Sequence, residues 1–223
     1  MTTKTKILVA SAAALVVLVA AALVAGPRLY ASWAEGRAGD APTNTIDGPV
    51  PDEAAEYTGT LTVSDGSVAG YRVDEVLQGE DVTVRGSTDQ VTGEASVTDG
   101  TLTDVTIEVD VASIETDSEQ RDAYFRSTAL ETDQFPTATF TLTEPAELEA
   151  GNDTVVLTGT FEIHGVTQPA EVTAHVAADG DIVQVAGEIP LIFADYGVAA
   201  PNLGFVSVED EGSIEFALVL AAE

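Results

Sequence analysis

From residue 57 onward, apolar residues recur at every second position. The stretch 105–111 alternates Val or Ile with Thr, Glu or Asp, and similar rows run through 155–163, 183–193 and 214–220. A period of two puts successive side chains on opposite faces of a strand. One apolar and one polar face per strand is typical of antiparallel sheets. The chain is therefore predicted to be all-β.

Turn signals separate these rows, namely Ser64-Asp65-Gly66, Thr98-Asp99-Gly100, Ala150-Gly151-Asn152-Asp153 and Asp179-Gly180. Short turns between strands indicate pairing between sequence neighbours, hence an up-and-down order. Such a sheet has edges that must be buried, and closure into a barrel is one way to bury them.

One segment breaks the alternation. Residues from Ser118 to about Leu130 predict a short helix, capped by Asp117 or Ser118, with Tyr124 and Phe125 as apolar contacts. A single helix within a run of strands is expected to act as a lid or plug at a barrel mouth.

The N-terminal region differs from the rest of the chain. Residues 7–25 are apolar apart from Ser11, a length that can just span a membrane, and Lys4 and Lys6 precede them. We expect an uncleaved transmembrane signal anchor, with residues 1–6 in the cytoplasm and the rest outside. The alternative is cleavage and secretion.

Residues 26–56 are rich in Ala, Pro, Gly and Asp and show no periodicity. They predict a flexible linker, followed by a folded domain over residues 57–223.

Charge is very uneven along the chain. The formal net charge is −30, and residues 40–223 contain four arginines and no lysine. Such a surface repels phosphate backbones, so we expect no nucleic-acid partner. Solubility outside the cytoplasm is the simpler explanation, and acidic loops that bind Ca²⁺ are the alternative. There is no Cys, which excludes disulfides and thiolate metal sites.

The segment from 113 to 140 contains an unusual combination of residues. A strand ends in a Ser-Ile-x-Thr turn, an Arg-Asp pair lies in the helical segment, and a Phe-Pro opens the next strand. The residues concerned are Ser113, Ile114, Thr116, Arg121, Asp122, Phe125, Ser127, Phe135, Pro136 and Phe140, and a second motif runs from Ile163 to Pro169.

Together these motifs resemble the YceI family of lipid-binding β-barrel proteins, over about residues 57–223. The resemblance implies a lipocalin-like barrel of about eight strands that binds a polyisoprenoid or similar amphiphile outside the cytoplasm. Such a barrel is just wide enough inside for one ligand. A ligand-free barrel acting as a cell-surface interaction or stress-protective module is the alternative.

On this interpretation the apolar rows line a tunnel, with Ile107 as a representative wall residue. The rows are Val105–Val111, Phe140–Leu142, Phe161–Ile163, Ile189–Phe193 and Ile214–Leu218. The resemblance transfers no catalytic residue, so we expect no enzyme and no cofactor beyond a bound isoprenoid lipid or quinone. The expected partners are this lipid and, through residues 7–25, the membrane, and a homodimer is left open.

Several residues have two interpretations. Arg121 either meets a polar ligand head group or fixes the helix to the barrel through an acid. Phe125, Phe135 and Phe140 belong either to the core or to the ligand surface. The strand glycines, Gly86, Gly93, Gly159 and Gly187, indicate either room for a ligand or bulges.

The two histidines, His164 and His175, are predicted to be solvated on strand faces, with a shared metal site as the alternative. Thr167 and Pro169 are expected in the turn between the histidine-bearing strands. The irregular stretch from Tyr196 to Phe205 either shapes one barrel mouth or is a plain loop. Hydrolytic motifs such as Gly-x-Ser-x-Gly are absent.

Overall fold

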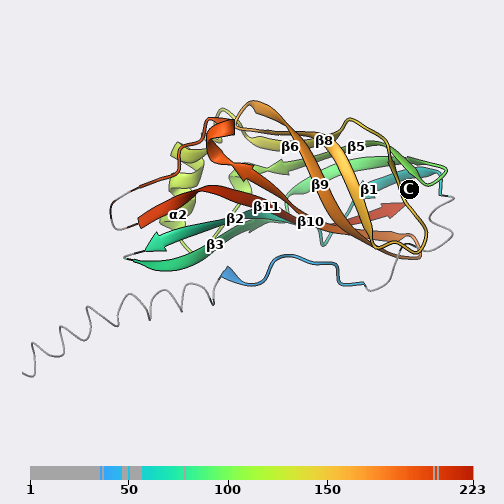
Figure 1. The fold of residues 1–223 in the computed structure, drawn as a ribbon, viewed down its shortest axis with the longest axis horizontal. Helices are drawn as coiled ribbons and strands as arrows, with labels where there is room; N and C mark the ends of the chain where they lie inside the picture. Colours follow the sequence, from blue (N-terminus) through green and yellow to red (C-terminus); the bar gives the residue numbers. More distant parts are fainter. Residues whose placement is uncertain are drawn as a thin grey trace, which may run out of the picture.

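The structure is a computed structural model that describes residues 36, 38–46, 50, 57–77, 79–202, 204 and 206–222. Within these residues the chain forms one antiparallel sheet that closes on itself (Figure 1). The strands are β1 (Gly59–Val63), β2 (Val68–Leu77), β3 (Glu80–Thr88), β4 (Val91–Thr98), β5 (Thr101–Asp110), β6 (Thr137–Leu142), β7 (Ala146–Glu147), β8 (Thr154–Ile163), β9 (Val166–Asp179), β10 (Ile182–Ile192) and β11 (Val206–Ala222).

Helical turns are few in the described part of the chain. They are the 3₁₀ turn η2 (Val111–Ser113), helix α2 (Glu119–Tyr124), its π-helical continuation η3 (Phe125–Ala129) and the 3₁₀ turn η4 (Phe193–Tyr196). The predicted helix is therefore confirmed, and Ser118 is its cap: the Ser118 hydroxyl accepts a hydrogen bond from the backbone N–H of Arg121.

The barrel is a ring of eight strands among the described residues: β1, β4, β5, β6, β8, β9, β10 and β11, closed by pairing of β1 with β11. β1 and β2 lie end to end along β11, and β4 and β3 lie end to end beside them. β1–β2 and β3–β4 are thus two long strands, each interrupted once. When each interrupted pair is counted as one strand, neighbours in sequence are neighbours in the sheet. The predicted up-and-down, all-β barrel is therefore confirmed.

The turn predicted at residues 64–66 does not form a hairpin. Ser64 N–H and the hydroxyls of Ser64 and Ser67 all donate to the carbonyl oxygen of Val219 on β11. These bonds keep the interrupted strand attached to the same neighbour on both sides of the break. The interruption therefore bends the strand line without reversing it.

Some of the glycines inside strands make room for aromatic rings of neighbouring strands. Gly86 pairs with Tyr71 and Gly187 pairs with Phe216. A Cβ at either position would come within 2.7 Å of the Tyr71 ring or 3.0 Å of the Phe216 ring. Aromatic rings therefore occupy part of the space that a side chain would take. The sequence analysis had offered only room for a ligand or a bulge at these glycines.

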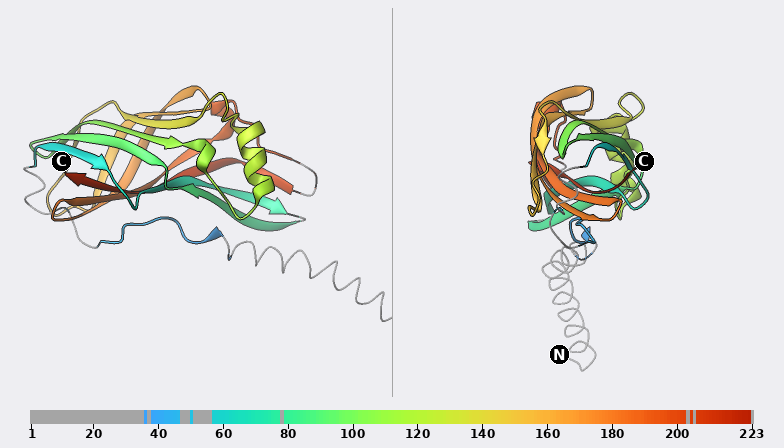
Figure 2. Two further views of the ribbon diagram at one scale, coloured as in Figure 1. Left: turned by 180° about the vertical axis from the view of Figure 1, so that it is seen from behind. Right: turned by 90° about the vertical axis from the view of Figure 1, so that its right-hand side faces the viewer.

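The two ends of the barrel are built differently (Figures 1 and 2). Helix α2 lies at one end, beside the tips of β2 and β3, and the C-terminal residues of β11 lie at the other. We call these the helix end and the mouth end. The mouth end also holds the β4–β5 and β9–β10 turns, since Gly100 N–H donates to Tyr57 O at 3.0 Å and Ala222 N–H to Asp181 O at 3.1 Å.

Part of the predicted linker contacts the barrel. The backbone N–H groups of Thr45 and Ile46 donate to the side-chain oxygen of Gln184 on β10, at 2.6 and 3.0 Å. Val50 is buried and exchanges backbone hydrogen bonds with Gly151 and Asn152. In the described residues no helix has the length and apolar character of a membrane span, and the predicted span at 7–25 lies outside them.

Candidate ligand-binding cavity

The barrel encloses a cavity of about 460 Å³, within the range of about 300–1,000 Å³ for small-molecule sites. Side chains from nine strands line it, all but β3 and β7 among those described. Among the described wall residues only Tyr57 and Asp181 have polar side chains, and Asp181 is exposed to solvent. The site is an apolar chamber with its polar groups at one end.

The predicted tunnel rows supply nine of the 28 described wall residues. Lining residues among them are Val105, Ile107, Val109, Phe140, Phe161, Ile189, Ile214, Phe216 and Leu218. The rows overshoot at their ends, however, because Val111 and Phe193 belong to η2 and η4, where the strands have stopped. Leu142 and Ile163 are buried but do not face the cavity.

The structure decides between the two interpretations for each of the three phenylalanines. Phe140 lines the cavity. Phe125 stacks on Tyr71 with ring centroids 4.9 Å apart, and Phe135 makes an edge contact with His164 at 4.8 Å. The latter two are half-buried, pack at the helix end and do not line the cavity.

Many wall residues lie outside the predicted tunnel rows, and three of them, at the mouth end, come from segments without alternation. Tyr57 precedes β1, Leu148 follows β7, and Val50 lies in the predicted linker. Backbone bonds hold this part together: Leu148 N–H donates to Gly100 O at 2.9 Å and Val50 N–H to Asn152 O at 2.8 Å. None of the three lies in an alternating row, so periodicity gave no signal for them.

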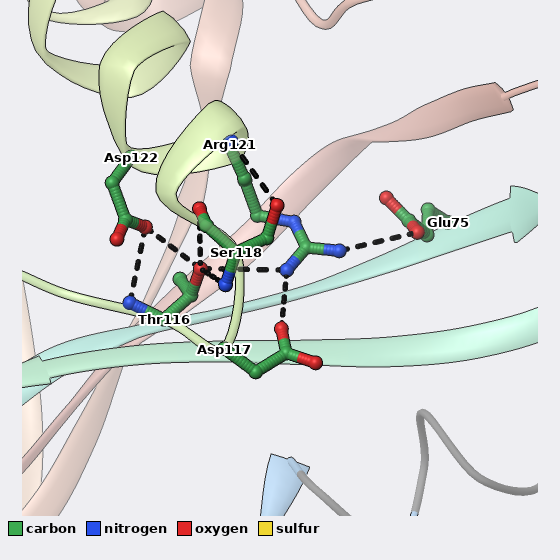
Figure 3. Close-up of polar contacts among 6 residues, drawn as sticks. All are labelled: Glu75, Thr116, Asp117, Ser118, Arg121 and Asp122. Atoms are coloured by element: carbon green, nitrogen blue, oxygen red, sulfur yellow. Dashed lines mark hydrogen bonds and ion pairs between the residues drawn. The ribbon is translucent and has the colours of Figure 1, made fainter.

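The helix end is closed by a polar network around Asp122 (Figure 3). Asp122 is 5% exposed, and its carboxylate accepts hydrogen bonds from Thr116 N at 3.0 Å and Thr116 Oγ1 at 2.7 Å. Ser118 N–H donates to the same Thr116 hydroxyl at 3.1 Å. Asp122 thus ties the start of α2 to the turn that leaves β5, and a buried carboxylate needs such partners.

Arg121 connects this network to the barrel wall (Figure 3). One terminal nitrogen lies 2.7 Å from Asp117 Oδ1, and the other lies 3.8 Å from Glu75 Oε1 on β2. Burial raises the pKa of Glu75, and the Arg121 charge opposes that rise. Burial also raises the pKa of Tyr71. Because Arg121 does not line the cavity, the geometry favours its role of fixing the helix.

The two histidines are far apart: His175 is exposed on strand β9, as predicted, whereas His164 differs from the prediction. His164 lies in the two-residue β8–β9 turn, with φ of +54°, and not on a strand face. Its ring is within hydrogen-bonding distance of Tyr196 O, at 3.1 Å, and Glu131 Oε2, at 3.2 Å. His175 lies near the opposite end of β9, paired with Thr154. The prediction for His164 failed because the β8–β9 turn is shorter than expected.

Thr167 and Pro169 accordingly lie in β9 and not in the turn. No cluster of three or more potential metal ligands from His, Cys, Asp or Glu occurs in the described residues. The stretch after β10 closes the helix end, since Tyr196 in η4 is buried and makes an edge contact with Phe161 at 6.1 Å between ring centroids.

Comparison with known proteins agrees with this architecture. Residues 60–220 match the YceI-like domain. The chain belongs to the YceI-like family. A UPF0312 protein of Shewanella sp. (strain ANA-3) is 35% identical over 81 residues, which are 36% of this chain and 41% of that protein. A UPF0312 protein of Pseudomonas aeruginosa (strain LESB58) is 33% identical over 78 residues. The matches span about two fifths of these relatives.

Solved structures of family type share the fold at low sequence identity. A polyisoprenoid binding domain from Saccharophagus degradans aligns with a TM-score of 0.58 and 16% identity, covering 75% of this chain and 100% of that one. Burkholderia cenocepacia BcnA aligns with a TM-score of 0.53 and 20% identity, covering 67% and 95%. At this identity the likeness supports the YceI-like barrel fold.

Proposed function

We propose that this YceI-like protein binds a polyisoprenoid or a similar long-chain amphiphile inside the barrel. The observation that carries the proposal is the 460 Å³ cavity with an almost wholly apolar wall. Its volume also favours the carrier over a ligand-free barrel, whose interior side chains would fill the space. The Saccharophagus degradans protein with the same fold is a polyisoprenoid binding domain, which supports this ligand class.

The driving force is removal of the apolar chain from water. Each buried CH₂ contributes roughly 0.8 kcal/mol, so ten such groups contribute about 8 kcal/mol before the cost of ordering the chain. Affinity of this kind needs few hydrogen bonds. The site therefore requires no catalytic group, and we propose binding without chemistry.

We further propose that the barrel is held outside the cytoplasm, next to the membrane that holds its ligand. The support is in the sequence: an apolar stretch at residues 7–25 preceded by two lysines. A tethered barrel would exchange lipid with that membrane, and a secreted form would carry lipid away from it.

Two matched variants test lipid binding. Ile107→Trp places a large ring in the cavity wall, whereas Val156→Trp places the same ring on the outer face of β8, where Val156 is 52% exposed. Protein isolated from its own host would be analysed by native mass spectrometry. We expect bound lipid in the wild type and in V156W, and its loss in I107W. Absence of lipid from the wild type, or equal lipid in both variants, would contradict the proposal.

A further inference from the structure

The mouth end of the cavity carries negative charge and no described positive charge. Asp181, in the β9–β10 turn, is the one ionisable acid or base among the described wall residues apart from the Tyr57 phenol. Asp99, Asp153 and Asp179 belong to the turns and strand ends around it.

Each of the four described arginines is engaged elsewhere. Arg85 donates to Glu215 at 2.8 Å and to Gly39 O at 2.6 Å, and Arg72 pairs with Asp74 at 2.7 Å. In the sheet both arginines lie level with Ser213 on β11, which is nine residues before Ala222 at the mouth end. At about 3.4 Å per residue, this places them about 30 Å from the mouth end.

The other two arginines are at the helix end. Arg121 pairs with Asp117 and Glu75, and Arg126 donates to the carbonyl oxygen of Ile114 at 3.5 Å. No lysine occurs after residue 39. The described mouth thus offers no cation to an anionic head group, and recognition of phosphate in proteins relies on Arg, Lys or clustered backbone N–H groups.

Two described wall residues have polar side chains, Tyr57 and the solvent-exposed turn residue Asp181 at the rim, and both offer hydrogen-bond acceptors. The Tyr57 hydroxyl uses its proton in a bond to Thr60 O at 3.3 Å and keeps its lone pairs. A carboxylate such as that of Asp181 accepts hydrogen bonds through both oxygens. A head group that donates a proton complements both, whereas one that brings only oxygen acceptors complements neither.

We propose that the cavity selects an amphiphile whose apolar chain ends in a hydrogen-bond donor, an alcohol or an amine, and rejects the same chain ending in phosphate. This inference rests on the proposed lipid-binding function and adds the polarity of the head group to it. The apolar chain supplies affinity, and Asp181 discriminates between head groups.

Three ligands with one chain test it: farnesol, farnesylamine and farnesyl monophosphate, each titrated against the full chain by isothermal calorimetry below its micelle-forming concentration. We expect farnesol and farnesylamine to bind at least tenfold more tightly than the phosphate. Equal or tighter binding of the phosphate would overturn the head-group inference and leave lipid binding intact. Failure of all three ligands to bind would instead overturn the proposed function.

A charge reversal identifies the residue responsible. Asp181→Lys should tighten binding of farnesyl monophosphate at least tenfold and weaken binding of farnesylamine. Asp133→Lys makes the same change of net charge on an exposed residue at the helix end, so it should leave both affinities within a factor of two. If the two variants behave alike, Asp181 does not select the head group. Thermal unfolding of each variant verifies that the barrel is intact.

Discussion

The two ends of the barrel use polar residues in opposite ways. At the helix end, the carboxylate of Asp122 and the guanidinium of Arg121 both have hydrogen-bond or ion-pair partners at 2.7–3.8 Å. At the mouth end, backbone bonds join the turns, and Asp181 lines the cavity with no described cation nearby. Paired polar groups hold the helix end together, and the mouth end is where we propose that the head group is selected.

The largest expected effect is at the helix end. Asp122→Ala removes the acceptor of both Thr116 bonds and leaves a half-buried N–H unpaired, so the free energy of unfolding should fall by about 2 kcal/mol. Urea denaturation measures the change. Lipid affinity should not change, because Asp122 is outside the cavity wall. Asp133→Ala, on the exposed part of the same connection, should cost less than about 0.5 kcal/mol. Equal losses of unfolding free energy in D122A and D133A would show that the Asp122 network does not stabilise the helix end.

A smaller effect is expected at the mouth end. Val50→Ala removes two methyl groups from a side chain that is 4% exposed, so we expect a loss of about 1.5 kcal/mol. Because Val50 also lines the cavity, release of bound lipid should become faster. Stopped-flow dilution measures the release rate, and Val156→Ala on the outer face is the control. A release rate that matches this control would show that Val50 does not restrict exit.

The smallest effect concerns pH. The pKa of Glu75 is raised above its ordinary value of 4.5 by burial. Between the ordinary and the raised value the folded state binds the proton more tightly than the unfolded chain, so this group makes stability fall as pH rises through that window. Glu75→Gln should flatten that part of the stability curve. Denaturation at pH 4, 5.5 and 7 tests this, with exposed Glu108→Gln as the control. If stability fell more steeply with pH in E75Q than in the wild type, the prediction for Glu75 would be wrong.

The sequence predicted the regular parts of the molecule because regular burial leaves a periodic pattern. Ile107 and its row face the cavity as the alternation required, and Ser118 caps the helix as its residue type required. The resemblance to the YceI family identified the fold from only a few motif residues.

Other features depended on contacts that no local pattern records. Glu75 is one of 38 acids, so its role as the partner of Arg121 was not apparent before the strands were placed. Val50 joins the wall through backbone bonds from a segment without periodicity. Residues 64–66 have the composition of a hairpin turn, but their bonds to Val219 on β11 keep the strand line running on. Each of these was set by tertiary contacts.

The long closing strand β11 has a consequence for how the protein folds. Its seventeen residues pair with β10, β2 and β1, and its contact with Ser64 joins positions 155 residues apart in the chain. Contacts of such sequence separation cost loop-closure entropy before they are rewarded, which slows folding. The barrel cannot close until the last residues of β11 reach β1. During that interval the apolar wall is open along one side, so the unclosed barrel exposes apolar surface to solvent.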